Sequence, residues 1–291
     1  MSPGWTNFHT HSNFCDSVGD PEDFIKAALK QNVKVLGFSS HAPLPFATDW
    51  TMEPAHLPEY YARINHLKAE YRDKLSIYLG LEIDYIPGLT GPRAPQFVAS
   101  GLDYCIGSVH YVGRNAPQGS YLIDGSAEEF ARGIKQVYGG NAQQAVERYY
   151  ELVREMAVKE PPDIIGHLDL IKINNLHERY FSEAESWYRA AVEATIRTIA
   201  QGRAIVEINT GGIARKKIST FYPSPWIIEL CMAHRITITL SADAHKPEQL
   251  TGEFSRAAQM LHDIGYKEMA VLTPQGWRQY PFSAQGVELD F

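Results

Sequence analysis

Residues 5–11 read WTNFHTH, a run with the composition of a buried strand that ends in two histidines, His9 and His11. Asp20-Pro21-Glu22-Asp23 follows, and it predicts a helix start because Asp is a good N-cap and Pro suits the first helical position. KVLGFSS at 34–40 then predicts a second strand. This order of strand, helix and strand predicts two parallel strands joined by a crossover helix.

The same alternation continues along the chain. Further strands are predicted at 75–85, 104–111, 163–171, 204–209, 236–241 and 269–272. Helices are predicted at 57–72, 126–138, 142–159, 183–201, 224–234 and 247–261, and 113–125 is predicted to be a loop. No linker is evident, so we expect one α/β domain over 1–291 with a helical insertion around 113–160. The pattern alone is compatible with a closed barrel and with an open sheet.

Composition narrows the classes of partner. The 291 residues include 27 Lys and Arg, 34 Asp and Glu, 11 His and 3 Cys, for a formal net charge of −7. This balance disfavours extended nucleic acid but permits a small anionic substrate, because a local cation can override the net charge. No apolar stretch is long enough to span a membrane, and the first residues lack a signal-peptide pattern, so we expect a cytoplasmic protein. The oligomeric state is left open.

Histidines or carboxylates stand at the carboxyl ends of six predicted strands. They are His9 and His11, His41, Glu82, His110, His167, and Asp243 with His245. Parallel strands end at one edge of their sheet, and residues two apart on a strand share a face. Each residue alone could be a hydrogen-bonded structural group, but their shared position favours a metal site. Imidazole and carboxylate ligands suit Zn, Mn or Fe, and no CxxC offers thiolates.

Ordered motifs around these residues resemble the PHP (polymerase and histidinol phosphatase) superfamily over nearly the whole chain. The motifs are His9-Thr10-His11, Ser40-His41-Ala42-Pro43, Gly80-Leu81-Glu82, Gly107-Ser108-Val109-His110, Gly166-His167-Leu168-Asp169 and Ser241-Ala242-Asp243-Ala244-His245. Longer stretches resemble the histidinol-phosphate phosphatases within it: GSVHYVG, GHLDLIKINN, EINTGGIARK, Tyr222-Pro223-Ser224 and SADAHKPE. The resemblance implies a distorted (β/α)7 barrel with its site at the carboxyl ends of the strands.

The resemblance also implies a centre of three divalent metal ions. By motif, the first ion is assigned to His9, His11, Glu82 and Asp243, the second to Glu82, His110 and His167, and the third to Asp16, His41 and His245. Related proteins often have a histidine at the position that Asp16 occupies in this chain, and Cys15 is an alternative donor in the same loop. Zn, Fe and Mn all remain open as the metal.

The activity implied is hydrolysis of L-histidinol phosphate to L-histidinol and phosphate, a step of histidine biosynthesis. A metal-bound hydroxide would attack the phosphorus, and Asp243 or His245 would manage proton transfer. Arginine recognises phosphate through two parallel hydrogen bonds, so Arg215 is the first candidate for phosphate binding, followed by Arg179 and Arg114.

The rest of the substrate carries an ammonium and an imidazole. Tyr111, Asp124 and Tyr222 are candidates to recognise them, and the sequence does not rank the three.

Two alternatives stay open. One is a PHP phosphoesterase that acts on a nucleotide or another small phosphate ester. The other is a metal-binding interaction module without catalysis, which the complete set of nine candidate ligands disfavours.

Overall fold

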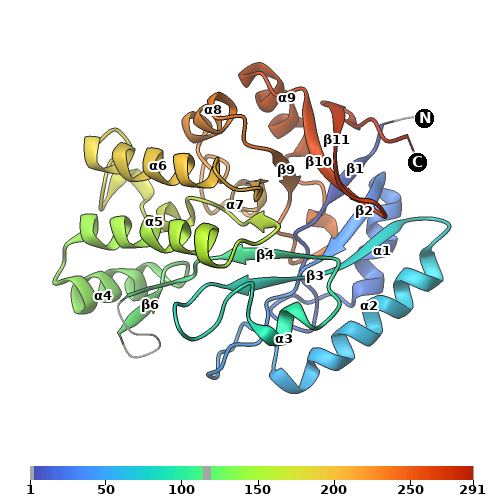
Figure 1. The fold of residues 1–291 in the computed structure, drawn as a ribbon, viewed down its shortest axis with the longest axis horizontal. Helices are drawn as coiled ribbons and strands as arrows, with labels where there is room; N and C mark the ends of the chain where they lie inside the picture. Colours follow the sequence, from blue (N-terminus) through green and yellow to red (C-terminus); the bar gives the residue numbers. More distant parts are fainter. Residues whose placement is uncertain (1–2, 114–118, 291) are drawn as a thin grey trace.

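A computed structural model describes residues 3–113 and 119–290. Seven parallel strands form one sheet in the order β1-β2-β3-β4-β7-β8-β9 (Figure 1). Their bounds are β1 Trp5–Asn7, β2 Val33–Phe38, β3 Ser76–Asp84, β4 Tyr104–Ser108, β7 Ile164–Ile165, β8 Ile205–Asn209 and β9 Ile238–Ser241. Each strand pairs with the next barrel strand along the chain, as the alternating pattern predicts.

The two edge strands meet just beyond their carboxyl ends. Thr10 and Ala244 form a parallel bridge, in which His11 N donates to Ala244 O at 2.9 Å and Ala244 N donates to His9 O at 3.1 Å. These bonds bring the beginning and the end of the sheet together into a nearly closed barrel. The expected (β/α)7 barrel is therefore confirmed.

Helices surround the strands. They are α1 Pro21–Lys30, α2 Leu57–Tyr71, α3 Pro95–Val98, α4 Ala127–Tyr138, α5 Ala142–Lys159, α6 Ser186–Ile199, α7 Gly211–Ala214, α8 Pro225–Ala233 and α9 Phe254–Ile264. The predicted cap of α1 is present, because Asp20 Oδ1 accepts from Glu22 N at 2.9 Å. A capping box between Ser126 and Glu129 starts α4. The helices predicted between strands 104–111 and 163–171 are α4 and α5.

Several segments differ from the predictions, among them the short helices α3 and α7, which were not expected. The strand predicted at 104–111 ends at Ser108, and a hairpin of β5 Tyr111–Gly113 and β6 Ser120–Leu122 follows it and extends into the predicted loop 113–125. This hairpin packs on α4 and α5. The strand predicted at 163–171 ends at Ile165 and is followed by the short 3-10 turn η2, Leu170–Lys172. The helix predicted at 247–261 is a 3-10 turn, η4 Pro247–Gln249, followed by α9, because Glu253 adopts a left-handed φ of 65° between them.

A small antiparallel sheet adds strands that the sequence did not predict. It consists of β10 Glu268–Thr273, β11 Gly276–Ser283 and β12 Gly286–Val287, of which only part of β10 was expected. Trp277 of β11 contacts Phe8 edge-to-face, with ring centroids 4.9 Å apart, so this sheet packs against the barrel interior.

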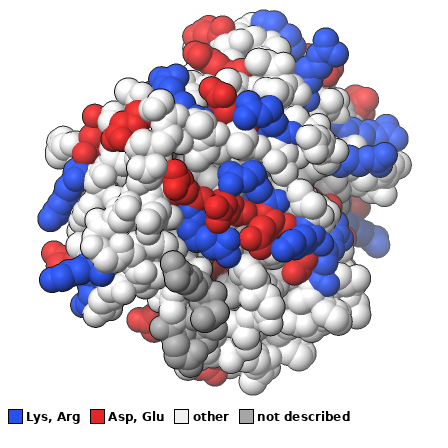
Figure 2. Space-filling model, turned by 60° about the vertical axis from the view of Figure 1, so that its left-hand side comes forward, with Lys and Arg blue, Asp and Glu red and all other residues white. Residues whose placement is uncertain are grey.

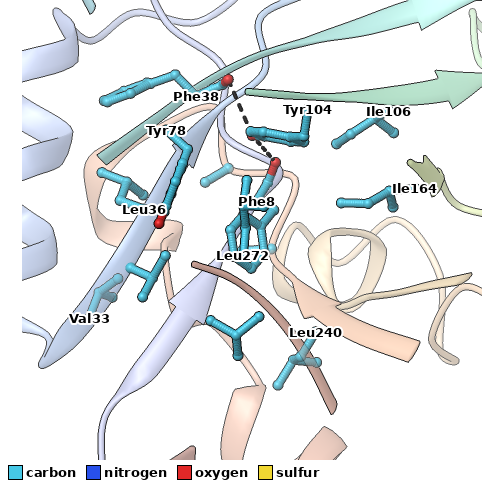
Figure 3. Packing of buried hydrophobic residues seen from close by; sticks show 14 of the residues in the cluster. Phe8, Val33, Leu36, Phe38, Tyr78, Tyr104, Ile106, Ile164, Leu240 and Leu272 are labelled. Carbon is cyan, nitrogen blue, oxygen red and sulfur yellow. Dashed lines mark hydrogen bonds between the residues drawn. The ribbon is translucent and has the colours of Figure 1, made fainter. Parts of the chain in front are cut away.

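Large apolar side chains fill the barrel interior below the strand ends (Figure 3). Tyr104 lies at the centre, where its hydroxyl donates to Phe8 O at 2.6 Å and to Phe38 O at 3.2 Å. Gly37 and Gly80 make room for its ring, since a Cβ at either position would overlap it. Tyr104 therefore ties three strands together directly beneath the edge that carries the histidines.

Acidic and basic side chains lie next to one another on the face shown in Figure 2. The described residues of this face form no long stripe of one sign, the pattern that extended nucleic acid requires. None of the helices in the described ranges has the length and apolarity needed to cross a bilayer.

Candidate metal centre

A cavity of about 350 Å³ opens at the carboxyl ends of the barrel strands. It is lined by Asp16, His41, Trp50, Glu82, His110, Leu122, Asp124, His167, Leu170, Ile173, Arg215, Lys217, Tyr222, Asp243 and His245. Seven of the nine predicted metal ligands are in this lining, and His9 and His11 are fully buried beneath it. The structure thus brings all nine together.

Glu82 stands at the centre of the cluster, with its two carboxylate oxygens facing opposite sets of histidines. Oε1 is 2.9 Å from His167 Nε2 and 3.6 Å from His110 Nε2. Oε2 is 3.1 Å from His9 Nε2 and 3.0 Å from His41 Nδ1. A carboxylate in this arrangement can bridge two cations, one through each oxygen.

Three groups of these residues have donor atoms close enough to share one ion each. They are His9, His11 and Asp243; His41, Glu82 and His110; and His11, Asp16, His41 and His245. The first and third contain the residues assigned to the first and third ions, apart from Glu82, whose Oε2 lies 3.6 Å from His11 Nε2. The second groups Glu82 and His110 with His41 in place of His167, although His167 and His110 both approach Oε1 of Glu82.

Asp16 lies at the rim of the cavity and is partly exposed. Its Oδ2 is 3.1 Å from His245 Nε2, and its Oδ1 is 3.8 Å from His11 Nδ1. Burial, followed by the nearby Asp16 charge, raises the pKa of the Cys15 thiol to about 12, which keeps it protonated. Asp16 belongs to one of the groups of donor atoms that could share an ion, whereas Cys15 belongs to none of those found among the described residues.

A second set of buried groups holds the histidine rings, and the sequence analysis did not identify it. Glu207 Oε1 is 2.6 Å from His9 Nδ1, while Glu207 Oε2 accepts from His167 N at 2.8 Å. Asp84 Oδ1 is 3.0 Å from His110 Nδ1. Each carboxylate takes one ring nitrogen, so the other nitrogen of each ring faces Glu82. Asp84 is the last residue of β3, a signal that could have marked it, whereas Glu207 lies in the middle of β8.

Burial and charge set the protonation of the cluster. Burial opposes ionisation of Glu82, but the His9 and His41 rings hold the pKa of its carboxyl well below the usual range. Burial likewise opposes a charge on His9, yet Glu207 and Glu82 raise its pKa well above 6.5. Burial, together with the neighbouring His245 and His41 rings, lowers the pKa of His11 to about 3. Glu82 is therefore ionised, as a carboxylate ligand must be.

Buried polar atoms without a partner test whether divalent ions fit this site. Among the described residues, His9 Nε2, His11 Nε2 and Glu82 Oε2 are buried and form no hydrogen bond. Such atoms cost free energy unless something binds them. Because Glu82 Oε2 lies 3.1 Å from His9 Nε2 and 3.6 Å from His11 Nε2, a cation among them would satisfy all three. The donor set of imidazole and carboxylate fits Zn, Mn or Fe.

The three arginines predicted to bind phosphate lie in different places. Arg215 lines the cavity, donates from Nη2 to Asp243 Oδ2 at 2.9 Å, and contacts Asp243 O and His245 Nδ1 through Nη1. Arg179 is exposed and does not line the cavity; instead its guanidinium lies 5.3 Å from the ring centroid of Tyr180. The structure therefore does not bring Arg179 to this cavity, and its loop directs the side chain onto an aromatic face. Arg114 lies outside the described residues.

The residues predicted to recognise the rest of the substrate lie in the cavity wall or next to it. Asp124 lines the cavity, and its Oδ1 is buried without a hydrogen bond among the described residues. Tyr222 also lines it. Tyr111 does not, but it stacks on Trp50, which does, with centroids 6.3 Å apart. Trp50 was not singled out from the sequence, and it also packs edge-on against His41 at 4.6 Å.

The barrel and the cluster at its mouth define a metal-dependent phosphoesterase of the PHP type. The PHP domain model matches residues 7–211, and the chain belongs to this family. Its relatives are histidinol-phosphatases: the Deinococcus radiodurans protein named "Probable histidinol-phosphatase" is 31% identical over 270 residues, covering 90% of this chain and 94% of the relative. The histidinol-phosphatase of Bacillus subtilis is 28% identical and covers 82% and 92%.

A solved structure supports the fold. The histidinol phosphate phosphatase of Lactococcus lactis, determined with zinc, L-histidinol and phosphate, superposes with a TM-score of 0.67. It shares 23% identity, and the alignment covers 98% of this chain and 99% of that one.

Proposed function

We propose that this protein is a histidinol-phosphatase, which hydrolyses L-histidinol phosphate to L-histidinol and phosphate in histidine biosynthesis. The observation that carries the proposal is the convergence of eight imidazole and carboxylate side chains around a ninth, Glu82, with Arg215 in the lining of the same cavity. The relatives named histidinol-phosphatase extend over most of the chain, which supports the substrate.

Three divalent ions are proposed for the cluster, held by His9, His11, Asp16, His41, Glu82, His110, His167, Asp243 and His245. When bound, such ions supply hydroxide near neutral pH and neutralise charge on phosphoryl oxygens. Glu82 is the residue shared between ions, because its oxygens face two sets of histidines. Zinc in the Lactococcus lactis enzyme supports zinc as the first metal to test.

Arg215 binds the phosphate in this proposal. Asp243 and His245 orient the guanidinium through Nη1 and Nη2, and Arg215 is among the residues that line the cavity. Burial opposes the charge, but Asp243 raises the pKa of Arg215, which stays cationic. Asp243 and His245 border Arg215 and are the groups assigned to move a proton to the leaving oxygen.

Asp124 is proposed to bind the ammonium of the substrate. Asp124 lines the cavity together with the apolar residues Leu122, Leu170 and Ile173, and its buried Oδ1 has no hydrogen-bond partner among the described residues. An ammonium would pair with the carboxylate, and the imidazole would contact the apolar wall.

The test is turnover of histidinol phosphate, p-nitrophenyl phosphate and a nucleotide, each before and after chelation and after metal is restored. The expected result is efficient, metal-dependent release of phosphate from histidinol phosphate. The proposal fails if the metal-loaded protein does not hydrolyse histidinol phosphate but hydrolyses the nucleotide efficiently.

A further inference from the structure

A buried lysine lies behind the wall of the cavity. Lys172, the last residue of η2, is 6% exposed. Its Nζ donates to Asp169 Oδ2 at 2.7 Å, to Phe221 O at 2.8 Å and to Ser224 Oγ at 2.6 Å. The three bonds use all three N–H groups of the ammonium. Because a buried charge without partners is costly, this set of acceptors accounts for the lysine's position.

The same network fixes the turn that precedes α8. Asp169 Oδ2, which accepts from Lys172, also accepts from Ser224 N at 2.9 Å. Ser224 Oγ in turn donates to Glu183 Oε1 at 3.0 Å. Lys172 therefore binds this turn at both ends, at Phe221 and at Ser224.

Tyr222 lies between those two anchor points and reaches the cavity. Its backbone pairs with Asn209 through bonds of 2.7 and 3.1 Å, and its ring centroid is 5.2 Å from Lys172 Nζ. The side chain is 1% exposed and lines the cavity, yet its hydroxyl has no hydrogen-bond partner among the described residues. A buried hydroxyl of this kind gains free energy from an oxygen ligand that enters the cavity.

We propose that the Tyr222 hydroxyl donates a hydrogen bond to a phosphoryl oxygen of the substrate, and that Lys172 is the positioning residue that holds Tyr222 there. This inference rests on the proposed function, because it assumes that a phosphate monoester occupies the cavity. Lys172 is not among the described residues that line the cavity, and its three N–H groups are all engaged, so it acts through the turn.

A double-mutant cycle on metal-loaded protein distinguishes a role of Lys172 in positioning Tyr222 from a general contribution to the stability of the fold. Tyr222→Phe and Lys172→Met are each expected to weaken binding of inorganic phosphate about tenfold, measured by calorimetry, since one hydrogen bond to a charged group is lost in both. The double variant should lose no more than either single variant, because both remove the same contact. The KM for p-nitrophenyl phosphate should rise in parallel, with metal content unchanged.

Two variants control for the loss of buried polar contacts away from the cavity. Tyr266→Phe removes a hydroxyl that bonds Ile236 O at 3.0 Å, and Arg154→Met removes a cation that bonds Thr195 Oγ1 at 3.0 Å. Both should bind phosphate as the unmodified protein does, even where their melting temperature falls.

The proposal is overturned if Lys172→Met binds phosphate normally, or if the two losses multiply to about hundredfold in the double variant. Should Lys172→Met fail to fold, Ser224→Ala removes one of the three lysine bonds and must shift phosphate affinity in the same direction. Inorganic phosphate and p-nitrophenyl phosphate distinguish failure of this inference from failure of the proposed function. A protein that binds both but does not hydrolyse histidinol phosphate contradicts the proposed substrate and leaves the double-mutant cycle valid.

Discussion

Replacement of Glu207 by Gln is predicted to weaken metal binding through the tautomer of a single histidine. Glu207 is fully buried; it accepts from His167 N at 2.8 Å and from Asn209 Nδ2 at 3.0 Å, and it contacts His9 Nδ1 at 2.6 Å. A carboxylate only accepts hydrogen bonds, so the ring proton that His9 keeps when a cation binds lies on Nδ1, and Nε2 gives up its proton and binds the cation.

The amide of Glu207→Gln has two possible orientations. If its NH2 faced His167 N and Asn209 Nδ2, two buried donors would lose their acceptor, at a cost of about 1–3 kcal/mol each. The amide therefore turns its NH2 toward His9, where Nδ1 must accept and Nε2 must carry the proton. A protonated Nε2 cannot bind a metal ion. Losses of about 10–100-fold in metal affinity are typical when such supporting groups are removed, equivalent to about 1.4–2.8 kcal/mol.

Competition with a chelator for Zn²⁺ measures this loss directly, and phosphatase activity should return when excess zinc is added. Asp163→Asn is the matched control, because its carboxylate accepts a backbone bond from Cys105 N at 2.9 Å away from the cluster. Zinc affinity within about twofold of the unmodified protein in Glu207→Gln would refute the reasoning, because His9 would then bind metal without the aid of Glu207.

Three further predictions concern the cavity. Arg215→Ala should raise the KM for phosphate esters about tenfold or more with metal content unchanged, whereas Arg179→Ala should leave KM unchanged; equal effects in steady-state kinetics would contradict the assignment. His9→Ala should lose bound metal and activity together, and elemental analysis that finds full occupancy would remove His9 from the ligands. In metal-free protein, burial opposes a charge on His110, but Asp84 raises its pKa to about 10. The stabilisation from this charge is complete below about pH 6.5 and is lost as pH rises through about 10, so melting temperature should fall over that range, and less so in His110→Gln.

Much of the barrel and of its ligands can be predicted from the sequence, for a physical reason. Parallel strands end at one edge, so a histidine or carboxylate that follows each apolar run reaches the same place. His41 illustrates this: it pairs with Glu82 across neighbouring strands although the two lie far apart in the chain. Local sequence decides where each strand ends, and the sheet then brings the ends together.

The supporting contacts are harder to predict, because they depend on distances between side chains of different strands. Glu207 looks like an ordinary strand residue until its position beneath His9 is known. The direction of Arg179 depends in the same way on the ring of Tyr180. The hairpin β5–β6 and the strand β11 have short or mixed exposure patterns, so tertiary packing decides their structure more than periodicity does.

The bridge that closes the barrel lies within the candidate metal site. Thr10 and Ala244 join the edge strands, and each stands between two residues whose side chains enter the cluster. Bound ions would therefore act as a removable cross-link between the beginning and the end of the chain, one that stabilises the folded barrel because these ligands converge only in the folded state. In a protein whose three cysteines form no disulfide, metal supply would then govern the integrity of the barrel as well as its chemistry.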